Sequence, residues 1–133
     1  MPIDKTTEEW LVMRYFREKY LQFPKGKLIK TESPDFILRV NRRKRIGIEL
    51  TRLDYLLKDV TNKNELSGLL RILIAQKEEK LPLYRKNRLS EYWLIVSSDS
   101  LKIGLPEHLI LNSKFDKVFL IDLFSGLIVV SEG

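Results

Sequence analysis

Alternating apolar and polar side chains mark two neighbouring strands near the middle of the chain. Large apolar residues alternate with other residues over positions 36–40, and they do so again over positions 46–50. Period-two alternation is typical of β-strands whose two faces meet different surroundings. The polar tip Arg42-Arg43-Lys44 separates the two segments, which favours a turn. We therefore predict an antiparallel hairpin at this point of the chain.

The register of this hairpin decides whether two acidic residues share a face. A three-residue loop over positions 42–44 pairs Asn41 with Arg45, and it makes Asp35 and Glu49 diagonal neighbours on one face. A two- or four-residue loop places the two acids on opposite faces, because the side-chain period of a strand is two. The three-residue loop also gathers the apolar residues of both strands on the other face. We therefore predict the register in which the acids share a face.

A helical pattern precedes the hairpin. Thr6 and Glu9 have the spacing of a capping box, and an apolar row at helical spacing continues from Glu9 to Tyr20. The pattern predicts a helix from Thr6 to about Tyr20, with Glu9 as the partner of the cap. A short strand over positions 27–31 is expected to lead from this helix into the hairpin.

A second helical pattern starts at Asn62 or Asn64, after a polar segment that we expect to form a loop. Leucines recur at helical spacing along this helix, and both Lys77 and Lys80 fall inside the same stripe. A lysine on a packing face commonly extends its ammonium outwards to water. The alternative is that Lys77, one turn beyond Leu73, projects its ammonium towards the acids of the hairpin.

Three further strands complete the predicted sheet. Positions 91–97 are almost continuously apolar, as in a strand that is covered on both faces, and positions 117–123 and 127–131 form two more strands. A short helix is expected over positions 106–111, because proline is tolerated in a first turn. The order of elements predicts one α/β domain over residues 1–133, with a mixed central β-sheet flanked by helices.

The two acids resemble the motif of the PD-(D/E)XK nuclease superfamily. The usual pattern has an Asp on one strand, followed on the next strand by a Glu or Asp, one residue, and a Lys. Asp35 and Glu49 match this pattern, whereas Thr51 stands where the motif lysine would be. The resemblance covers about residues 6–97. It implies a restriction-endonuclease-like core and a metal site in which the backbone carbonyl of Leu50 joins the two acids.

Members of this superfamily are known to carry the lysine on a following helix instead. Gln76, Lys77 and Lys80 look like such a helix, and we favour Lys77 over Lys80 as the substitute for the motif lysine. A glutamate from the first helix often joins the metal site in this family. Glu9 is therefore also a candidate for the site, although the capping role is favoured.

Composition removes several other kinds of chemistry. The chain has no cysteine and one histidine, so thiolate metal sites, cysteine nucleophiles and Ser-His-Asp triads lack the residues they need. The six glycines form no phosphate-binding loop. No signal sequence or membrane-spanning apolar run is visible, so we expect a cytoplasmic protein without a membrane partner. The net charge of +6 favours a polyanionic partner.

These features predict a metal-dependent nuclease in which Asp35 and Glu49 hold Mg²⁺ or Mn²⁺, the hard cations that prefer oxygen ligands. DNA is expected as the substrate ahead of RNA, and a homodimer is possible, since many nucleases of this kind cut duplexes as dimers. The alternative is an inactive module of the same fold that binds nucleic acid or a protein, which the threonine at position 51 supports. The residues expected to hold the nucleic-acid backbone are Arg39, Arg42, Arg43, Lys44 and Arg45.

Overall fold

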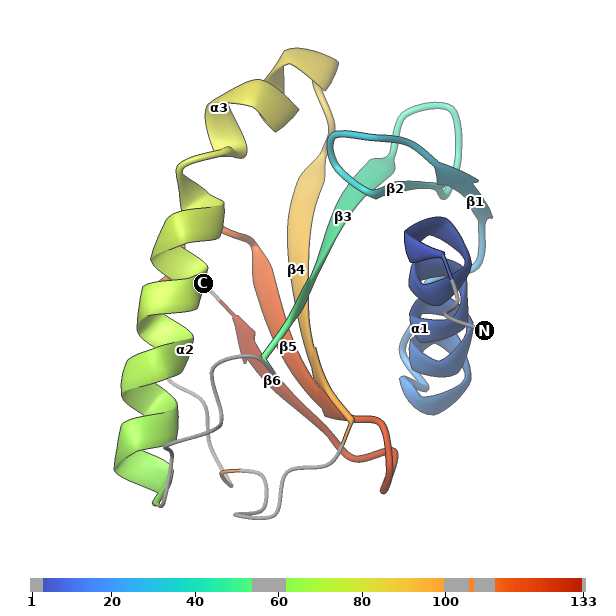
Figure 1. Ribbon diagram of the computed structural model, residues 1–133. Helices are drawn as coiled ribbons and strands as arrows, with labels where there is room; N and C mark the ends of the chain where they lie inside the picture. The colour runs from blue at the N-terminus through green and yellow to red at the C-terminus, as the bar shows by residue number, and fades with distance from the viewer. Residues whose placement is uncertain (1–3, 54–61, 100–105, 107–111, 133) are drawn as a thin grey trace.

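The computed structural model describes residues 4–53, 62–99, 106 and 112–132, and in this part of the chain helices surround a six-stranded sheet (Figure 1). The helices are α1 (Lys5–Lys19), α2 (Lys63–Glu78), α3 (Leu81–Tyr84) and the 3-10 helix η2 (Arg85–Asn87). The strands are β1 (Lys27–Lys30), β2 (Phe36–Arg39), β3 (Arg45–Arg52), β4 (Glu91–Ser98), β5 (Lys117–Asp122) and β6 (Ile128–Glu132).

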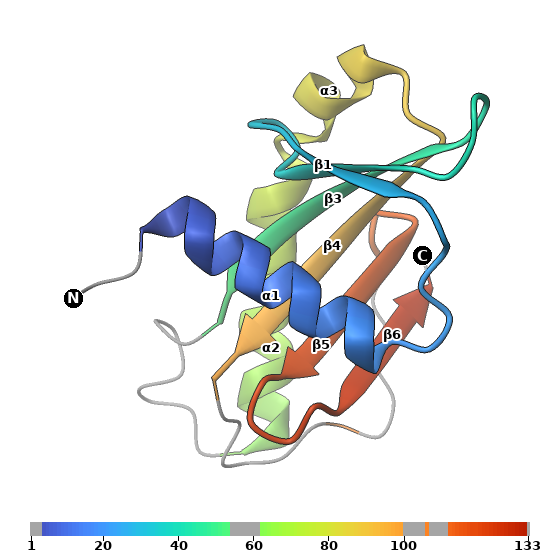
Figure 2. The ribbon, with the colours of Figure 1, turned by 90° about the vertical axis from the view of Figure 1, so that its right-hand side faces the viewer.

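The sheet is mixed, as predicted, and its strands lie in the order in which the chain makes them. The first three strands form an antiparallel meander, β3, β4 and β5 are parallel, and β6 returns antiparallel to β5. The helix α1 covers one face of the sheet and α2 covers the other (Figures 1 and 2). Because β3 and β4 are parallel, the connection that contains α2 has to cross over one face.

Side-chain caps decide where the two long helices begin. Asp4 caps α1, since its carboxylate accepts the backbone N–H of Thr7 at 2.8 Å. The predicted capping box of Thr6 and Glu9 is therefore wrong, because the helix starts before Thr6. Asn62, one of the two candidates, caps α2 through the backbone N–H of Glu65 at 2.9 Å.

The β2–β3 hairpin has the predicted three-residue loop, placed one position earlier in the chain. The loop covers residues 41–43, because the side-chain oxygen of Asn41 accepts the backbone N–H groups of Arg43 and Lys44, each at 2.8 Å. The backbone N–H of Val40 then bonds to the carbonyl of Lys44 at 3.0 Å and starts the ladder. An asparagine that bonds to the backbone two and three residues ahead forms a turn of its own.

The earlier loop shifts the strand pairing by two residues. Arg39 faces Arg45, so the predicted pairing of Asn41 with Arg45 is wrong. An even shift leaves every side chain on its predicted face. Continued by one position beyond β2, the observed register sets Asp35 directly opposite Glu49 rather than diagonally across from it. The prediction that the two acids share a face is confirmed.

Each face of the sheet has its own apolar core. The core under α1 is rich in aromatic rings and contains Met13, Phe16, Phe36, Leu38, Ile46, Ile48, Trp93, Ile95, Phe119 and Ile121. The core under α2 is mostly aliphatic, with Leu66, Leu70, Leu73, Leu94, Val96 and Leu120 among its members. The apolar sides of β2 and β3 lie in the first core, which turns their other sides towards α2.

The second half of the sheet agrees with the predicted strands. The strands predicted over positions 91–97, 117–123 and 127–131 are confirmed as β4, β5 and β6, with ends that differ by one residue. The helix expected over positions 106–111 lies outside the described residues, apart from Pro106. Within residues 4–53, 62–99 and 112–132, no helix combines the length and apolarity needed to cross a bilayer.

Candidate active site

Asp35 and Glu49 meet on the face of the sheet that α2 covers. Their residues are 9% and 5% exposed, which is unusual for carboxylates. The backbone N–H of Leu50 donates to the Asp35 carboxylate at 2.9 Å, and this contact fixes Asp35 against the middle of β3. The side chains of Asp35 and Glu49 are in hydrogen-bonding contact with each other. The hairpin thus brings together two acids that lie far apart in the sequence.

Lys77 reaches this pair from α2. Its ammonium nitrogen lies 3.8 Å from Oε2 of Glu49, and its side chain is only 20% exposed. Thr51, at the position of the motif lysine, is half-buried and projects from the same face of β3 as Glu49. The structure therefore places an amine beside the acids, from the helix that the sequence indicated.

Two other residues of the predicted helix do not reach the acids. Gln76 and Lys80 are exposed, and no contact joins either of them to Asp35 or Glu49 among the described residues. The reason is geometric for Lys80, because α2 ends at Glu78 and Lys80 caps the separate helix α3.

Glu9 lies beside Asp35 instead of capping its own helix. Its carboxyl group contacts that of Asp35, and Oε1 lies 3.6 Å from the ammonium of Lys30. Lys30 also donates to the backbone carbonyl of Asp35 at 3.1 Å. The start of β2 packs against α1, since the rings of Trp10 and Phe36 lie 4.9 Å apart, and this packing brings Glu9 to the site.

Tyr84 and Lys30 are site residues that the sequence analysis missed. The Tyr84 hydroxyl donates to Oε2 of Glu49, and the ring is 2% exposed. The available signal was that a buried tyrosine hydroxyl needs a polar partner. Lys30 gave no comparable signal, because lysines at strand ends are common on edges.

The surroundings shift the pKa values of the three acids in different directions. Burial, together with the contact from Asp35, raises the pKa of Glu49 to about 7, although Tyr84 and Lys77 oppose this rise. Burial also disfavours the ionised form of Asp35, yet contacts with Glu49, the Leu50 N–H, Glu9 and Lys30 outweigh it and lower the Asp35 pKa. Burial and the neighbouring Asp35 raise the pKa of Glu9. The ionised cluster is therefore short of positive charge.

The donor set fits a hard divalent cation. Mg²⁺ usually binds proteins through one or two carboxylates, and water and substrate phosphates fill the remaining positions. Asp35 and Glu49 supply two such carboxylates in mutual contact, and Glu9 lies next to them. Over the ranges that the structure describes, no group of three or more His, Cys, Asp or Glu side chains is arranged to hold a metal ion. A site that is shared with water and substrate agrees with both observations.

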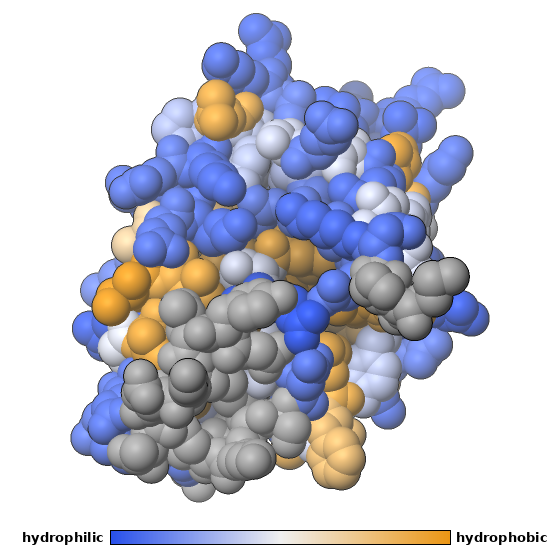
Figure 3. All heavy atoms as spheres, viewed as in Figure 1, coloured by the Kyte–Doolittle hydropathy of each residue, from blue (hydrophilic) through white to orange (hydrophobic). Residues whose placement is uncertain are grey.

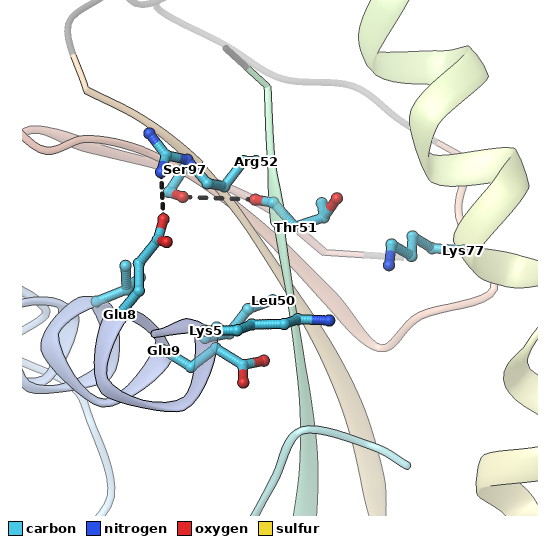
Figure 4. A pocket seen from close by; sticks show the side chains of 9 residues that line it. Lys5, Glu8, Glu9, Leu50, Thr51, Arg52, Lys77 and Ser97 are labelled. Atoms are coloured by element: carbon cyan, nitrogen blue, oxygen red, sulfur yellow. Dashed lines mark hydrogen bonds and ion pairs between the residues drawn. The ribbon is translucent and has the colours of Figure 1, made fainter. Parts of the chain in front are cut away.

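A cavity of about 480 Å³ opens beside the acids, at the carboxyl ends of the parallel strands β3 and β4 (Figure 4). Its lining includes Lys5, Glu9, Leu50, Thr51, Arg52 and Lys77. Lys5 extends from α1 and Lys77 from α2, so the two helices contribute cations from opposite sides. Arg52 is held by an ion pair with Glu8 and by Asp99 at 2.8 Å. The cavity thus offers positive charge next to the carboxylates.

The predicted nucleic-acid residues lie towards the other end of β3. Arg39 and the tip residues Arg42, Arg43 and Lys44 are exposed, whereas Arg45 is half-buried. Lys44 pairs with Glu91 at 3.1 Å, and the guanidinium of Arg45 donates to the backbone carbonyl of Asn87 at 3.2 Å. The structure therefore places these five residues near the hairpin tip, at a distance from the acids.

Fold and site together define a mixed α/β protein with a buried pair of carboxylates, a lysine beside them and a cation-lined cavity. No protein-family model matches the chain, and no curated protein and no solved structure matches it either. The chemistry of the site has to be argued from its own residues.

Proposed function

We propose that the protein is a metal-dependent nuclease that hydrolyses phosphodiester bonds of nucleic acid, DNA ahead of RNA. One observation carries this proposal: Asp35 and Glu49 face each other in a buried position, with the ammonium of Lys77 3.8 Å from Glu49. The order helix, three strands, helix, strand also agrees with the core that the PD-(D/E)XK resemblance implies. A restriction-endonuclease-like architecture is part of the same proposal.

Each residue of the site has a role in this proposal. Asp35, Glu49 and the carbonyl of Leu50 hold Mg²⁺ or Mn²⁺ in the role that the resemblance gives them. The bound ion supplies a water of lowered pKa and neutralises charge on the phosphate. The ammonium of Lys77 is a hydrogen-bond donor beside Glu49, and from there it can orient a water or a phosphate oxygen. Tyr84 fixes one oxygen of Glu49 through its hydroxyl and leaves the other oxygen for a ligand.

Site-directed variants of the acids test the proposal against a control variant outside the site. Purified protein is incubated with plasmid DNA and with RNA in Mg²⁺, in Mn²⁺ and in EDTA. Cleavage is expected with the metals alone, and Asp35→Asn and Glu49→Gln should each lower its rate by about 100- to 1,000-fold. Lys80→Ala removes an exposed lysine outside the site and should leave the rate unchanged. Equal cleavage by Glu49→Gln and the unaltered protein would rule out this site.

A second function is favoured by one residue. Thr51 stands where the motif lysine would be, and an inactive module of this fold could lack that lysine. Such a module would bind nucleic acid or a protein partner without a metal. Binding of nucleic acid in EDTA, unaffected by Asp35→Asn and without cleavage in Mn²⁺, would favour this function over the nuclease.

A further inference from the structure

Two basic segments from different parts of the chain lie side by side at one end of the molecule. The tip of the β2–β3 hairpin and the segment after α3 are joined by hydrogen bonds. Arg45 donates to the carbonyl of Asn87 at 3.2 Å, and its backbone N–H bonds to the hydroxyl of Ser90 at 3.2 Å. That hydroxyl in turn donates to the carbonyl of Arg43 at 3.3 Å. The two segments therefore form one surface with fixed backbone positions.

This surface carries a concentration of positive charge. We call it the basic ridge and define it by five exposed residues, Arg42, Arg43, Arg85, Lys86 and Arg88. No ion pair involves any of the five among the residues that the structure describes. The nearby Glu91 is paired with Lys44 instead. Most side chains at this end of the molecule, the upper end in the view of Figure 3, are hydrophilic.

Each part of the basic ridge is connected to the acid site by a short stretch of the chain. Arg85 follows Tyr84, whose hydroxyl contacts Glu49, so one part of the ridge begins beside the site. The other part is reached along β3, where Arg45 precedes Glu49 by four positions, about 13 Å in an extended strand. A duplex presents one phosphate of each strand per roughly 3.4 Å of its axis, so a duplex lying along β3 would place about four phosphates between the ridge and the acids.

The ridge offers charge without a stacking platform. The exposed aromatic residues of the described chain, Trp10 and Phe124, lie on α1 and in the β5–β6 turn. Arginine and lysine side chains neutralise phosphates irrespective of sequence, whereas base recognition needs stacking or a groove-reading element. The composition of the ridge therefore suits a nucleic-acid backbone.

We propose that the basic ridge binds the sugar–phosphate backbone of duplex DNA on one side of the acid pair, without reading the bases. The substrate class is thus a duplex that extends well past the position of cleavage. This inference rests on the proposed function for what happens at the acids, but binding by the ridge does not depend on it.

Fluorescence anisotropy with a labelled 20-base-pair duplex in EDTA tests the ridge without cleavage. The variants are Arg42→Ala/Arg43→Ala and Arg85→Ala/Lys86→Ala, measured between about 50 and 200 mM salt. The control Arg14→Ala/Arg71→Ala removes the same charge from exposed positions of α1 and α2. Each ridge variant should weaken binding on the order of tenfold at about 0.1 M salt. Each should also reduce the slope of log K against log salt by about 1.8, because two phosphate contacts are lost.

The outcomes separate this inference from the proposed function. Ridge variants that bind with the same slope as the control variant overturn the ridge, whatever the protein cleaves. A preference of more than about tenfold between two duplexes of unrelated sequence overturns backbone binding as well. Glu49→Gln should bind the duplex as the unaltered protein does. If no cleavage is found but the ridge variants show the reduced slope of log K against log salt, binding by the ridge is supported and the proposed nuclease activity is rejected.

Discussion

The two faces of the central sheet are built differently although they share the same strands. Under α1, the rings of Phe16 and Phe119 pack edge to face with centroids 4.9 Å apart, and Trp93 packs tilted against Phe119 at 5.2 Å. Under α2, the aliphatic core meets Glu49 and the neighbouring Asp35, which are also buried. One strand, β3, contributes to both faces through alternate residues.

This difference separates the source of stability from the source of chemistry. Burying an apolar side chain stabilises the fold, whereas burying a carboxylate costs free energy unless a partner compensates. Glu49 has partial compensation from Tyr84 and Lys77, yet its pKa is still raised to about 7. Apolar burial stabilises both faces, but the α2 face also buries carboxylates whose mutual repulsion a cation would relieve.

The largest contrast is expected between substitutions on the two faces. Phe119→Ala removes a fully buried ring and should lower the free energy of unfolding by about 3–5 kcal/mol. Glu49→Gln removes a buried charge while keeping the volume of the side chain. It should leave the unfolding free energy at pH 8 unchanged or raise it. Urea titrations in metal-free buffer measure both. A destabilisation of Glu49→Gln as large as that of Phe119→Ala would abolish the distinction between the faces.

Lys77 sharpens the chemical side of the comparison. Lys77→Ala should slow metal-dependent cleavage by about 100-fold, because the amine beside Glu49 is lost. The free energy of unfolding at pH 8 should also fall, because the buried Glu49 loses one of its compensating partners. Lys80→Ala is the matched control on the neighbouring exposed position. The comparison is made on cleavage rates at saturating Mn²⁺. A larger loss of rate with Lys80→Ala than with Lys77→Ala would contradict the assignment of this role to Lys77.

The pH dependence of stability should come from the α2 face. The pKa of Glu49 rises from 4.5 to about 7 on folding, so the native state binds more protons than the unfolded state between these values. The free energy of unfolding should therefore fall as pH rises from about 4.5 to 7, by on the order of 2–3 kcal/mol, and then level off. Denaturant titrations of Glu49→Gln should show a smaller fall. An identical profile for this variant would place the titration elsewhere.

A smaller effect is expected at Gly47, which lies beside Glu49 on β3. A Cβ there would come within 2.7 Å of Leu89 and 3.0 Å of Pro34, so Gly47→Ala should destabilise by about 1–3 kcal/mol. Gly68→Ala is the matched control, because nothing lies within 4 Å of its added Cβ and the residue is in a helix. That substitution should stabilise by about 0.5–1 kcal/mol. Thermal unfolding of both variants compares them, and equal shifts would contradict the close packing at Gly47.

Much of the architecture could be predicted because periodicity depends on local sequence. The alternation over β2 and β3 fixed which residues share a face, and an error of two in the pairing could not change that. The loop position depended instead on one hydrogen-bonding choice, in which Asn41 closes the turn before the basic tip. Similarly, Asp4 and not Thr6 is the N-cap residue of α1, because its carboxylate accepts the backbone N–H of Thr7. Choices between neighbouring polar residues are not visible in a hydrophobic pattern.

The site shows the same limit at longer range. Helical spacing was enough to bring Lys77 to the face of the acids, although it also admitted Lys80. The contacts of Glu9 and Tyr84 depend on how α1 and α3 pack, which the periodicity of one segment does not determine. Glu9 was consequently expected first as a cap partner and only second as a site residue, and Tyr84 was not predicted as a site residue.

The central claim is that Asp35 and Glu49 together hold a divalent cation. Calorimetric titration of Mn²⁺ into the metal-free protein at pH 7 tests it most directly. We predict one binding event that releases protons, because the raised pKa of Glu49 leaves it partly protonated before the metal binds. Both Asp35→Asn and Glu49→Gln should weaken binding by at least about tenfold and reduce the proton release. Mn²⁺ affinity and proton release that stay the same in both variants would contradict the claim.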